Sequence, residues 1–292
     1  MKILLLGKNG QLGWELHRTL APLGQVVALD IPEINLAQAE SIPDLVWKIQ
    51  PELIVNASAY TAVDRAESEP QTAMAINGHA PGLLASQAAD LGAAIIHYST
   101  DYVFDGEKGS LYLETDSPNP LNEYGSSKLA GEKSIQDVGG PYMILRTSWV
   151  YSMRGDGFVT KVLDWSRQQP ELRIVSDQIA NPTWARMLAE VTSQLIAMAG
   201  DDISAWLFER RGIYHLAGDG YTSRMDWADA ILEFDPNREE QLTQEVLAAK
   251  SSDFPTPARR PLFSALNCDR FVDTFGLSLP PWRETLSLAM SE

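Results

Sequence analysis

The chain has 292 residues, 45% of them hydrophobic and 21% charged, which is enough for one large domain and a smaller one. Its formal net charge of −16 argues against nucleic acid or an anionic membrane surface as a partner, because like charges repel. The single cysteine, Cys268, excludes an intramolecular disulfide and a thiolate zinc site, and fits a reducing cytoplasm. The first apolar run is too short for a signal peptide, and no run of about 18 apolar residues predicts a transmembrane helix.

Short apolar runs alternate with helical patterns over the first half of the chain. We expect strands at residues 3–6, 26–30, 53–56, 94–98 and 143–146. Helices are expected at residues 11–20, 39–49, 72–90 and 124–136. Strands that are apolar throughout and alternate with helices indicate a parallel sheet covered on both faces.

The second half of the chain is less regular. It predicts helices at residues 158–167, 183–199, 225–234, 240–249 and 282–289, and strands at residues 172–175 and 213–216. Residues 254–261 are rich in proline and are expected to form a loop. We therefore expect an α/β fold, a doubly wound parallel (Rossmann) sheet with a smaller C-terminal substrate domain. The larger domain spans residues 1–177 and the smaller, discontinuous one residues 178–292, with residues 213–217 returning to the sheet.

Three glycines, Gly7, Gly10 and Gly13, lie between the first predicted strand and the first predicted helix. There they allow a tight turn and a close backbone approach to a diphosphate, which the helix N-terminus also attracts. The alternative is a glycine-rich turn without a ligand. Asp30 ends the next strand, where a carboxylate usually holds a ribose 2′-hydroxyl and repels a 2′-phosphate. Asp30 alone favours NADH, and Lys8 is the only nearby cation that would offset a 2′-phosphate; the alternative is that Asp30 merely caps a loop.

Tyr124 and Lys128 are four residues apart, so on a helix they share one face. An ammonium there can lower the pKa of the phenol and let Tyr124 exchange a proton at neutral pH. By itself this spacing also fits an ordinary surface pair. Thr100 ends the fourth strand, and the small residues 56–61 end the third. Because ligands bind at the carboxyl edge of such sheets, we expect these segments to converge on one site.

Together these residues resemble the extended short-chain dehydrogenase/reductase superfamily. Within it, the segments 59–67, 99–104, 120–125, 146–151 and 258–261 are similar to those of the dTDP-4-dehydrorhamnose reductases. The resemblance extends from residue 3 to about residue 285. It implies that NADPH or NADH reduces a sugar nucleotide, dTDP-4-dehydro-L-rhamnose, to dTDP-L-rhamnose, a step of cell-surface polysaccharide biosynthesis.

The resemblance also implies the roles of individual residues. Thr100 would orient the keto oxygen, Tyr124 would protonate the developing alkoxide, and Lys128 would lower the pKa of Tyr124 and bind the nicotinamide ribose. The residues implied to bind the cofactor are Gly7, Gly10, Gln11, Leu12, Gly13, Asp30, Ala59, Tyr60, Thr61, Tyr98, Tyr124 and Lys128. Those implied to bind the substrate are Thr100, Asp101, Trp149, Asn181 and Arg259. For Trp149 the alternative is packing in the core.

Some members of this family dimerise through Mg²⁺ held by glutamates. Glu15 and Glu292 suit such a site by position, but Arg186 stands where another glutamate would be needed, so a Mg²⁺-linked dimer is disfavoured. A monomer and a homodimer both remain open, and no metal is expected at the catalytic site. His97 and His215 fall in apolar strands and are expected to be core histidines.

Two other readings stay open. One is a related sugar-nucleotide epimerase or dehydratase, which the acidic Asp101 after Thr100 does not exclude. The other is a non-catalytic subunit of the methionine adenosyltransferase regulatory type, which shares the fold. The complete set of Thr100, Tyr124 and Lys128, with the glycine turn, argues against that second reading.

Overall fold

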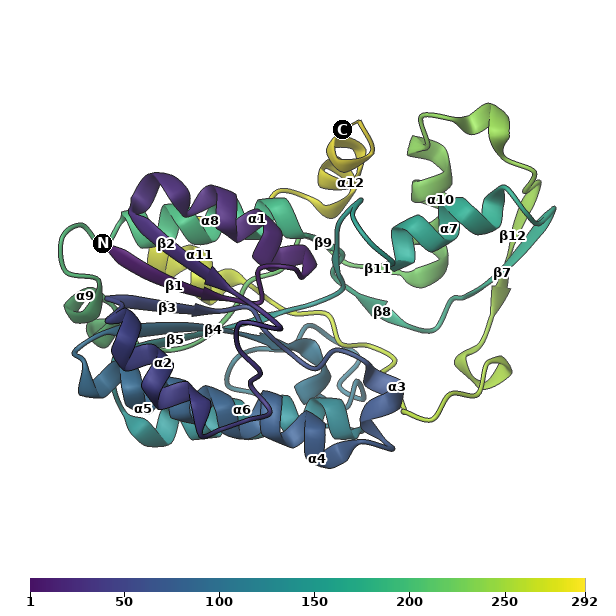
Figure 1. Cartoon of the computed structure of the whole chain (residues 1–292). Helices are drawn as coiled ribbons and strands as arrows, with labels where there is room; N and C mark the ends of the chain where they lie inside the picture. The colour runs from purple at the N-terminus through teal and green to yellow at the C-terminus, as the bar shows by residue number, and fades with distance from the viewer. Residues whose placement is uncertain (292) are drawn as a thin grey trace.

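A computed structural model describes residues 1–291 of the chain, built around one six-stranded parallel sheet (Figure 1). The strand order is β10-β5-β4-β3-β1-β2. The strands are β1 (Lys2–Leu6), β2 (Gln25–Leu29), β3 (Leu53–Asn56), β4 (Ala94–Thr100), β5 (Tyr142–Thr147) and β10 (Gly212–His215). The chain runs from β1 outward to β2 and then crosses to the other side of β1 at β3, so the winding reverses between β1 and β3. The predicted doubly wound fold is confirmed.

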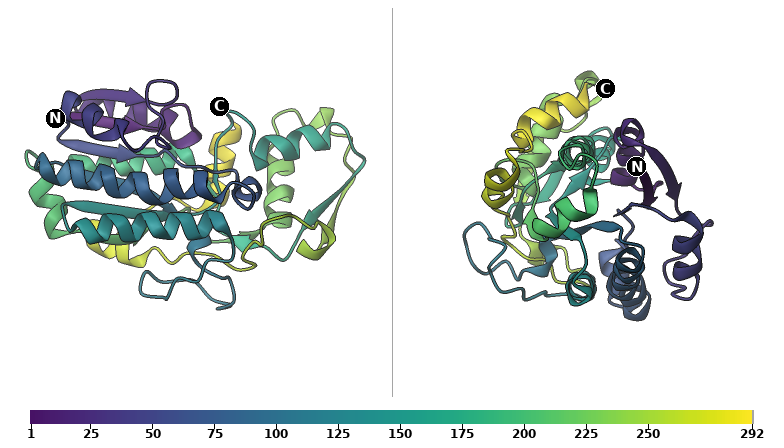
Figure 2. Two further views of the ribbon diagram at one scale, coloured as in Figure 1. Left: turned by 60° about the horizontal axis from the view of Figure 1, so that its bottom comes forward. Right: turned by 90° about the vertical axis from the view of Figure 1, so that its left-hand side faces the viewer.

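Helices cover both faces of this sheet (Figures 1 and 2). One face carries α1 (Gln11–Thr19), α8 (Ala185–Ala197), α9 (Ile203–Glu209) and α11 (Asp269–Phe275). The other carries α2 (Ser41–Ile49), α5 (Ala80–Asp90) and α6 (Glu123–Val138). Side chains alternate along each strand, so Ile3 and Leu5 enter the first core while Leu4 and Leu6 enter the second. This two-sided burial explains why the strands are apolar throughout.

A second lobe lies beyond the carboxyl edge of the sheet, where it has a core of its own around Trp227. It contains α7 (Phe158–Ser166), β7 (Glu171–Val175), α10 (Arg224–Phe234), β12 (Glu245–Ala249) and α12 (Trp282–Met290). Three short strand pairings complete the chain path near this lobe: β7 with β12, β6 (Val150–Tyr151) with β9 (Thr183–Trp184), and β8 (Ile179–Ala180) with β11 (Thr222–Ser223).

The remaining elements are short. Two helical turns, α3 (Val63–Ala66) and α4 (Pro70–Ala73), follow β3, and a π-helical segment, Met74–His79, joins α4 to α5. Single 3₁₀ turns occur at Ala21–Leu23, Asp101–Val103, Arg238–Glu240 and Ser251–Asp253. Over residues 1–291, no helix combines the length and the apolar composition that crossing a membrane would need.

One predicted element is wrong. Residues 240–249 do not form a helix: Glu245–Ala249 is β12, which pairs in parallel with β7. The segment is rich in Glu, Leu and Ala, which favour helix, but pairing with a partner strand overrides so weak a preference. The helices α9 and α11 were not predicted, and the predicted helix at 183–199 begins with the strand β9.

The packing bears on the division into domains. Helices α8, α9 and α11 follow residue 177 but pack on the sheet, whereas α7 and β7 precede it and pack in the second lobe. Strand β10 joins the sheet beside β5. The boundary at residue 177 stays a prediction.

Candidate active site

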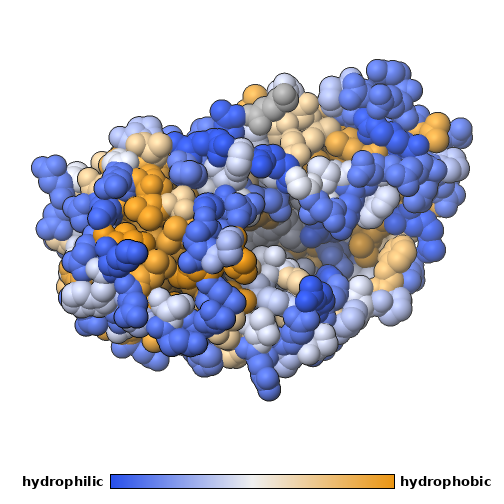
Figure 3. All heavy atoms as spheres, viewed as in Figure 1, coloured by the Kyte–Doolittle hydropathy of each residue, from blue (hydrophilic) through white to orange (hydrophobic). Residues whose placement is uncertain are grey.

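A cavity of about 640 Å³ opens at the carboxyl edge of the sheet. It lies where the winding reverses, and in the space-filling view the surface is hollowed between the sheet and the second lobe (Figure 3). Its walls come from the turn after β1, the ends of β2, β3 and β4, the start of α6 and the segment after β5. This volume suits a medium-sized organic ligand.

The glycine turn forms one end of the cavity. Gly7 has φ +88°, and a Cβ there would lie 2.8 Å from the backbone nitrogen of Ser58, so a side chain would fill the space beside the strand ends. A Cβ on Gly13 would lie 1.9 Å from the carbonyl oxygen of Gly7, so Gly13 permits the close packing of α1 against the turn. Gly10 is the N-cap of α1 and supplies no side-chain acceptor. The first N–H groups of α1 therefore lack a side-chain cap, as a helix that receives a diphosphate requires.

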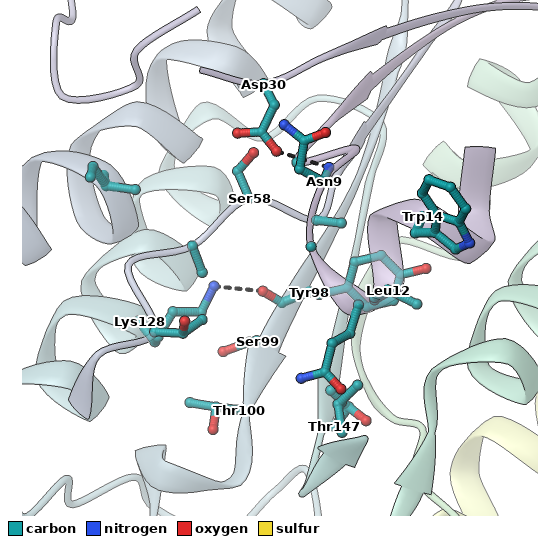
Figure 4. A pocket seen from close by; sticks show the side chains of 18 of the residues that line it. Asn9, Leu12, Trp14, Asp30, Ser58, Tyr98, Ser99, Thr100, Lys128 and Thr147 are labelled. Carbon is teal, nitrogen blue, oxygen red and sulfur yellow. Dashed lines mark hydrogen bonds between the residues drawn. The ribbon is translucent and has the colours of Figure 1, made fainter. Parts of the chain in front are cut away.

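Asp30 lines the cavity beside Asn9 of the glycine turn (Figure 4). Its two carboxylate oxygens accept backbone N–H groups, from Asn9 at 3.0 Å and from Ile31 at 2.8 Å. Lys8 does not extend to this carboxylate, because its ammonium pairs with Glu33 at 2.5 Å. This ion pair lowers the pKa of Glu33. Lys8, the cation that the sequence offers to offset a 2′-phosphate, is thus already paired with a carboxylate.

The chemically active groups meet where β4 ends and α6 begins. Asn122 caps α6 by accepting the N–H of Gly125 at 2.8 Å. A Cβ on Gly125 would lie 2.2 Å from the carbonyl oxygen of Tyr102, so the start of the helix packs directly on the loop after β4. This contact brings Tyr124 to Thr100. Burial raises the pKa of Tyr124 above its usual range, and a hydrogen bond with Thr100 partly opposes the rise.

The hydroxyl of Thr100 has a defined direction. It donates to the Asp101 carboxylate at 3.1 Å and accepts the N–H of Tyr102 at 3.2 Å, so its own hydrogen is directed to Asp101. Asp101 is buried and also accepts the hydroxyl of Ser264 at 2.5 Å. Burial raises the pKa of Asp101 to about 6, while these hydrogen bonds and the charge of Arg224 counteract the rise.

Lys128 is only 2% exposed, and its Nζ donates to the carbonyl oxygen of Tyr98 at 2.6 Å (Figure 4). Burial lowers the pKa of Lys128 to about 8, and the charge of Glu132 opposes this. Lys128 is not among the groups that shift the pKa of Tyr124, so its expected effect on that phenol stays a prediction. Desolvation dominates at Tyr124, and the Lys128 nitrogen is directed to the backbone of β4 instead.

Trp149 lies on the opposite wall and has φ +39°, a conformation that costs energy for any residue with a side chain. Its ring stacks on Trp227 at 5.4 Å between centroids. The guanidinium of Arg224 lies 3.7 Å from the Trp149 ring and 4.7 Å from the Phe158 ring. Within residues 1–291 this guanidinium has no hydrogen bond or ion pair, and burial lowers the pKa of Arg224 to about 10. The sequence did not single out Arg224, because a lone arginine at a helix start carries no motif.

The cavity gathers most of the predicted site residues. Those that line it are Gly7, Gly10, Gln11, Leu12, Asp30, Ala59, Thr61, Tyr98, Thr100, Asp101, Tyr124, Lys128 and Trp149. Four predicted residues lie outside the lining: Gly13, Tyr60, Asn181 and Arg259.

Two of those four have clear local roles. The Tyr60 hydroxyl donates to Glu69 at 2.6 Å. Asn181 is buried. Its amide nitrogen donates to the carbonyl oxygen of Gly220 at 2.8 Å, and its amide oxygen accepts the N–H of Leu266 at 2.8 Å. Arg259 is exposed. Contacts of these residues with a ligand stay predictions.

Several buried polar atoms of the cavity wall lack a partner in the described chain. They are the amide oxygen of Gln11 and the hydroxyls of Ser99, Thr147 and Ser148. A buried polar atom without a partner is costly, so a wall that gathers four of them suits a polar ligand. The sequence did not single out Thr147 and Ser148, which follow β5 at the same edge.

No group of three or more His, Cys, Asp or Glu side chains able to hold a metal occurs among residues 1–291. Glu15, Arg186 and Glu190 line a second cavity beside α1. Arg186 forms an ion pair with Glu190 there, with nitrogen and oxygen 3.1 Å apart. Glu292 lies outside the described residues, so the expectation about Mg²⁺ stays a prediction.

Comparison with known proteins agrees with this geometry. The model of the family described as RmlD substrate binding domain matches residues 1–292. The chain belongs to this family. It is also 42% identical to a dTDP-4-dehydrorhamnose reductase of Burkholderia thailandensis, over 100% of this chain and 99% of that protein. The resemblance read from the sequence motifs is therefore confirmed.

Solved structures of the same group superpose closely. A dTDP-4-dehydrorhamnose reductase from Clostridium acetobutylicum matches with a TM-score of 0.90 at 31% identity, covering 100% of this chain and 99% of that one. One from Bacillus anthracis, in complex with NADP, matches with a TM-score of 0.89 at 30% identity, covering 99% and 98%. The RmlD family membership thus holds over the sheet and the second lobe alike.

Proposed function

We propose that this chain reduces the 4-keto group of dTDP-4-dehydro-L-rhamnose with NADPH or NADH and forms dTDP-L-rhamnose. The observation that carries the proposal is the meeting of Thr100, Tyr124 and Lys128 in one cavity with the glycine turn. The family and the names of its relatives support the substrate. The reaction belongs to the biosynthesis of rhamnose-containing surface polysaccharides, for which a cytoplasmic enzyme, as a monomer or homodimer, is expected.

The wall of the cavity suits a dinucleotide. The uncapped N-terminus of α1 would hold the diphosphate, Asp30 the adenosine ribose, and Lys128 the nicotinamide ribose. Thr61 and Ala59, at the end of β3, leave room between these two ends. The Bacillus anthracis relative, solved with NADP, supports a nicotinamide cofactor. When bound, the reduced nicotinamide supplies the hydride.

The residues of the chain then handle the proton. Tyr124 lies beside Thr100 in the cavity, and the keto oxygen of the substrate would accept from the Tyr124 hydroxyl. Because the pKa of Tyr124 lies above its usual range, the phenol is protonated at neutral pH and able to give its proton to a developing alkoxide. Thr100 would hold the same oxygen in place.

The second lobe and the loop after β4 would together form the sugar-nucleotide side. Trp149 and Asp101 line the cavity beside Thr100 and would contact the sugar. Arg259 on the proline-rich loop would bind the diphosphate, since a guanidinium fork matches two phosphate oxygens. Asn181 would act from a buried position, where it accepts the N–H of Leu266, five residues beyond this loop.

Replacing Tyr124 with Phe tests the proposal. Oxidation of NADPH by dTDP-4-dehydro-L-rhamnose should fall by a factor of roughly 10²–10⁴, the usual contribution of a general acid, while NADPH still binds. Tyr112→Phe is the matched control, since Tyr112 donates to Asp105 outside the cavity. A wild-type rate in Tyr124→Phe would exclude the mechanism. Tightly retained NAD⁺ with no net cofactor consumption would instead indicate an epimerase.

A further inference from the structure

His97 and Asn56 form a buried chain of contacts that ends at Lys128. Both residues are 0% exposed and lie on adjacent strands, where Asn56 of β3 is directly opposite His97 of β4. The amide nitrogen of Asn56 lies 3.1 Å from Nδ1 of His97, and Nε2 of the same imidazole lies 3.2 Å from Nζ of Lys128. The imidazole therefore separates the end of β3 from the catalytic lysine.

The orientation of the Asn56 amide is set from the other side. Its oxygen accepts the backbone N–H of Ser58 at 3.1 Å. Turning the amide over would place its NH₂ against that N–H, so the NH₂ must face His97. An NH₂ group only donates, which makes Nδ1 of His97 the acceptor.

The protonation of His97 follows. Burial holds the pKa of His97 well below its usual range, so the imidazole is neutral and has one N–H. Because Nδ1 accepts from Asn56, that hydrogen is on Nε2, the atom that faces Lys128. An ammonium has three donors and no lone pair, whereas a neutral amine has a lone pair that can accept. Lys128 can accept from His97 only as the amine.

We propose that Asn56 and His97 are positioning residues that hold Lys128 as a neutral amine until the cofactor binds. The amine accepts from Nε2 of His97 and donates to the carbonyl oxygen of Tyr98 at 2.6 Å. The proposal rests on the proposed function for its second half: the anionic dinucleotide favours the charged form, so Lys128 takes up one proton from solvent as the cofactor binds.

The charged surroundings agree with this assignment. The acidic residue one turn along the same helix from Lys128 is Glu132. Its carboxylate forms an ion pair with Arg146 of β5, in which nitrogen and oxygen are 2.6 Å apart and both side chains are at most 2% exposed. Tyr124 on α6 and Tyr98 on β4 are neutral phenols, and burial raises the pKa of each. No free carboxylate among residues 1–291 therefore pairs with Lys128. Burial lowers the pKa of Lys128 to about 8 against the opposing charge of Glu132, and the His97 donor acts in the same direction as burial.

The test measures the pKa of Lys128 directly, in the full-length chain without added cofactor. With ¹³C-labelled lysine, the ε-carbon resonance that Lys128→Met removes is followed against pH. In the wild type it should titrate at pH 8 or below. In Asn56→Asp the new carboxylate accepts from Nδ1 and still accepts from Ser58, so Nε2 loses its hydrogen and can accept from an ammonium. The midpoint should then rise by at least about one pH unit, toward the ordinary value near 10.4.

His97→Gln offers a second route to the same rise, since its amide oxygen can accept from an ammonium. His215→Gln is the matched control: His215 is an equally buried imidazole, on β10, whose Nδ1 contacts the carbonyl oxygen of Asn267 and which makes no contact with Lys128. It should leave the midpoint unchanged. A wild-type midpoint near 10, or one that neither Asn56→Asp nor His97→Gln moves, would overturn the proposal.

A second measurement separates this proposal from the proposed function. Calorimetric titration of NADPH at pH 8, in buffers with different ionisation heats, should show uptake of about half a proton or more in the wild type and less in Asn56→Asp. Binding without proton uptake contradicts the role of His97 and leaves the reductase intact. A chain that does not bind NADPH contradicts the proposed function, and the lysine titration still decides the role of His97.

Discussion

Replacing Asp101 with Asn should stabilise the chain, and more so as the pH rises. Asp101 is 2% exposed, and burial raises its pKa from an ordinary value of 3.8 to about 6. The folded chain therefore binds this proton more tightly than the unfolded chain does. The contribution of Asp101 to stability is full below pH 3.8 and is lost as the pH rises through 6. A shift of about two units corresponds to about 3 kcal/mol at pH 8.

An Asn at this position cannot ionise, yet its amide keeps the shape of the carboxyl and can accept from Ser264 as the carboxylate does. The gain in unfolding free energy over the wild type should therefore grow by about 1.4 kcal/mol between pH 5 and pH 8. Urea unfolding, followed by tryptophan fluorescence at several pH values, measures this difference in unfolding free energy. The slope m should be equal in the two proteins, which checks that only stability has changed. Activity should fall in the same variant, because Asp101 sets the direction of the Thr100 hydroxyl.

Asp105→Asn is the control, with the opposite sign. The carboxylate of Asp105 accepts the Tyr112 hydroxyl at 2.6 Å, and this bond lowers its pKa. Its contribution to stability is present above the unfolded pKa and is lost as the pH falls. Asp105→Asn should therefore be less stable than the wild type at neutral pH, and the gap should narrow toward acid. If the Asp101→Asn and wild-type stabilities run parallel from pH 5 to pH 8, Asp101 does not have the raised pKa on which the reasoning depends.

Two further predictions concern the cofactor end of the cavity. Glu33→Gln releases Lys8 from its ion pair. The ratio of kcat/KM for NADPH to kcat/KM for NADH should then rise roughly threefold, which is the size of effect expected from one exposed charge. An unchanged ratio would mean that Lys8 does not reach the cofactor. Gly13→Ala forces a Cβ to within 1.9 Å of the Gly7 carbonyl oxygen and should weaken NADPH binding at least roughly tenfold. Gly10→Ala, whose Cβ would meet the same atom at 3.4 Å, should change binding by less than a factor of about three, and equal effects of the two would contradict the close-packing argument.

The sequence predicted the sheet well, because strands buried on both faces are apolar throughout and glycines mark the turn after β1. It failed where local preference and tertiary contact disagree. The helix-favouring residues of β12 form a strand only because β7, about 70 residues earlier, offers an edge. The π-helical segment Met74–His79 has no sequence signal of its own.

In the site, too, residues with a local sequence motif were predicted, and residues placed by tertiary packing were not. Thr100, Tyr124 and the glycine turn were predictable because each belongs to a local motif at a strand or helix end. Arg224 was not, since its place beside Trp149 depends on how the second lobe packs. His97 was expected to be a core histidine, and it is fully buried. Only the structure places its Nε2 against Lys128, because the contact joins two residues 31 positions apart.

The position of β10 in the chain has a consequence for how the protein is made. This strand pairs with β5, yet about 65 residues separate the two, and α8 and α9, which cover one face of the sheet, lie between them. During synthesis, β5 leaves the ribosome as an open edge beside a face that α8 and α9 do not yet cover, and the edge stays open until residue 215 has emerged. An open edge beside apolar surface invites wrong pairing and aggregation. The nascent chain is therefore most vulnerable between the completion of β5 and that of β10, and a chaperone that shields this face would raise the yield of folded protein.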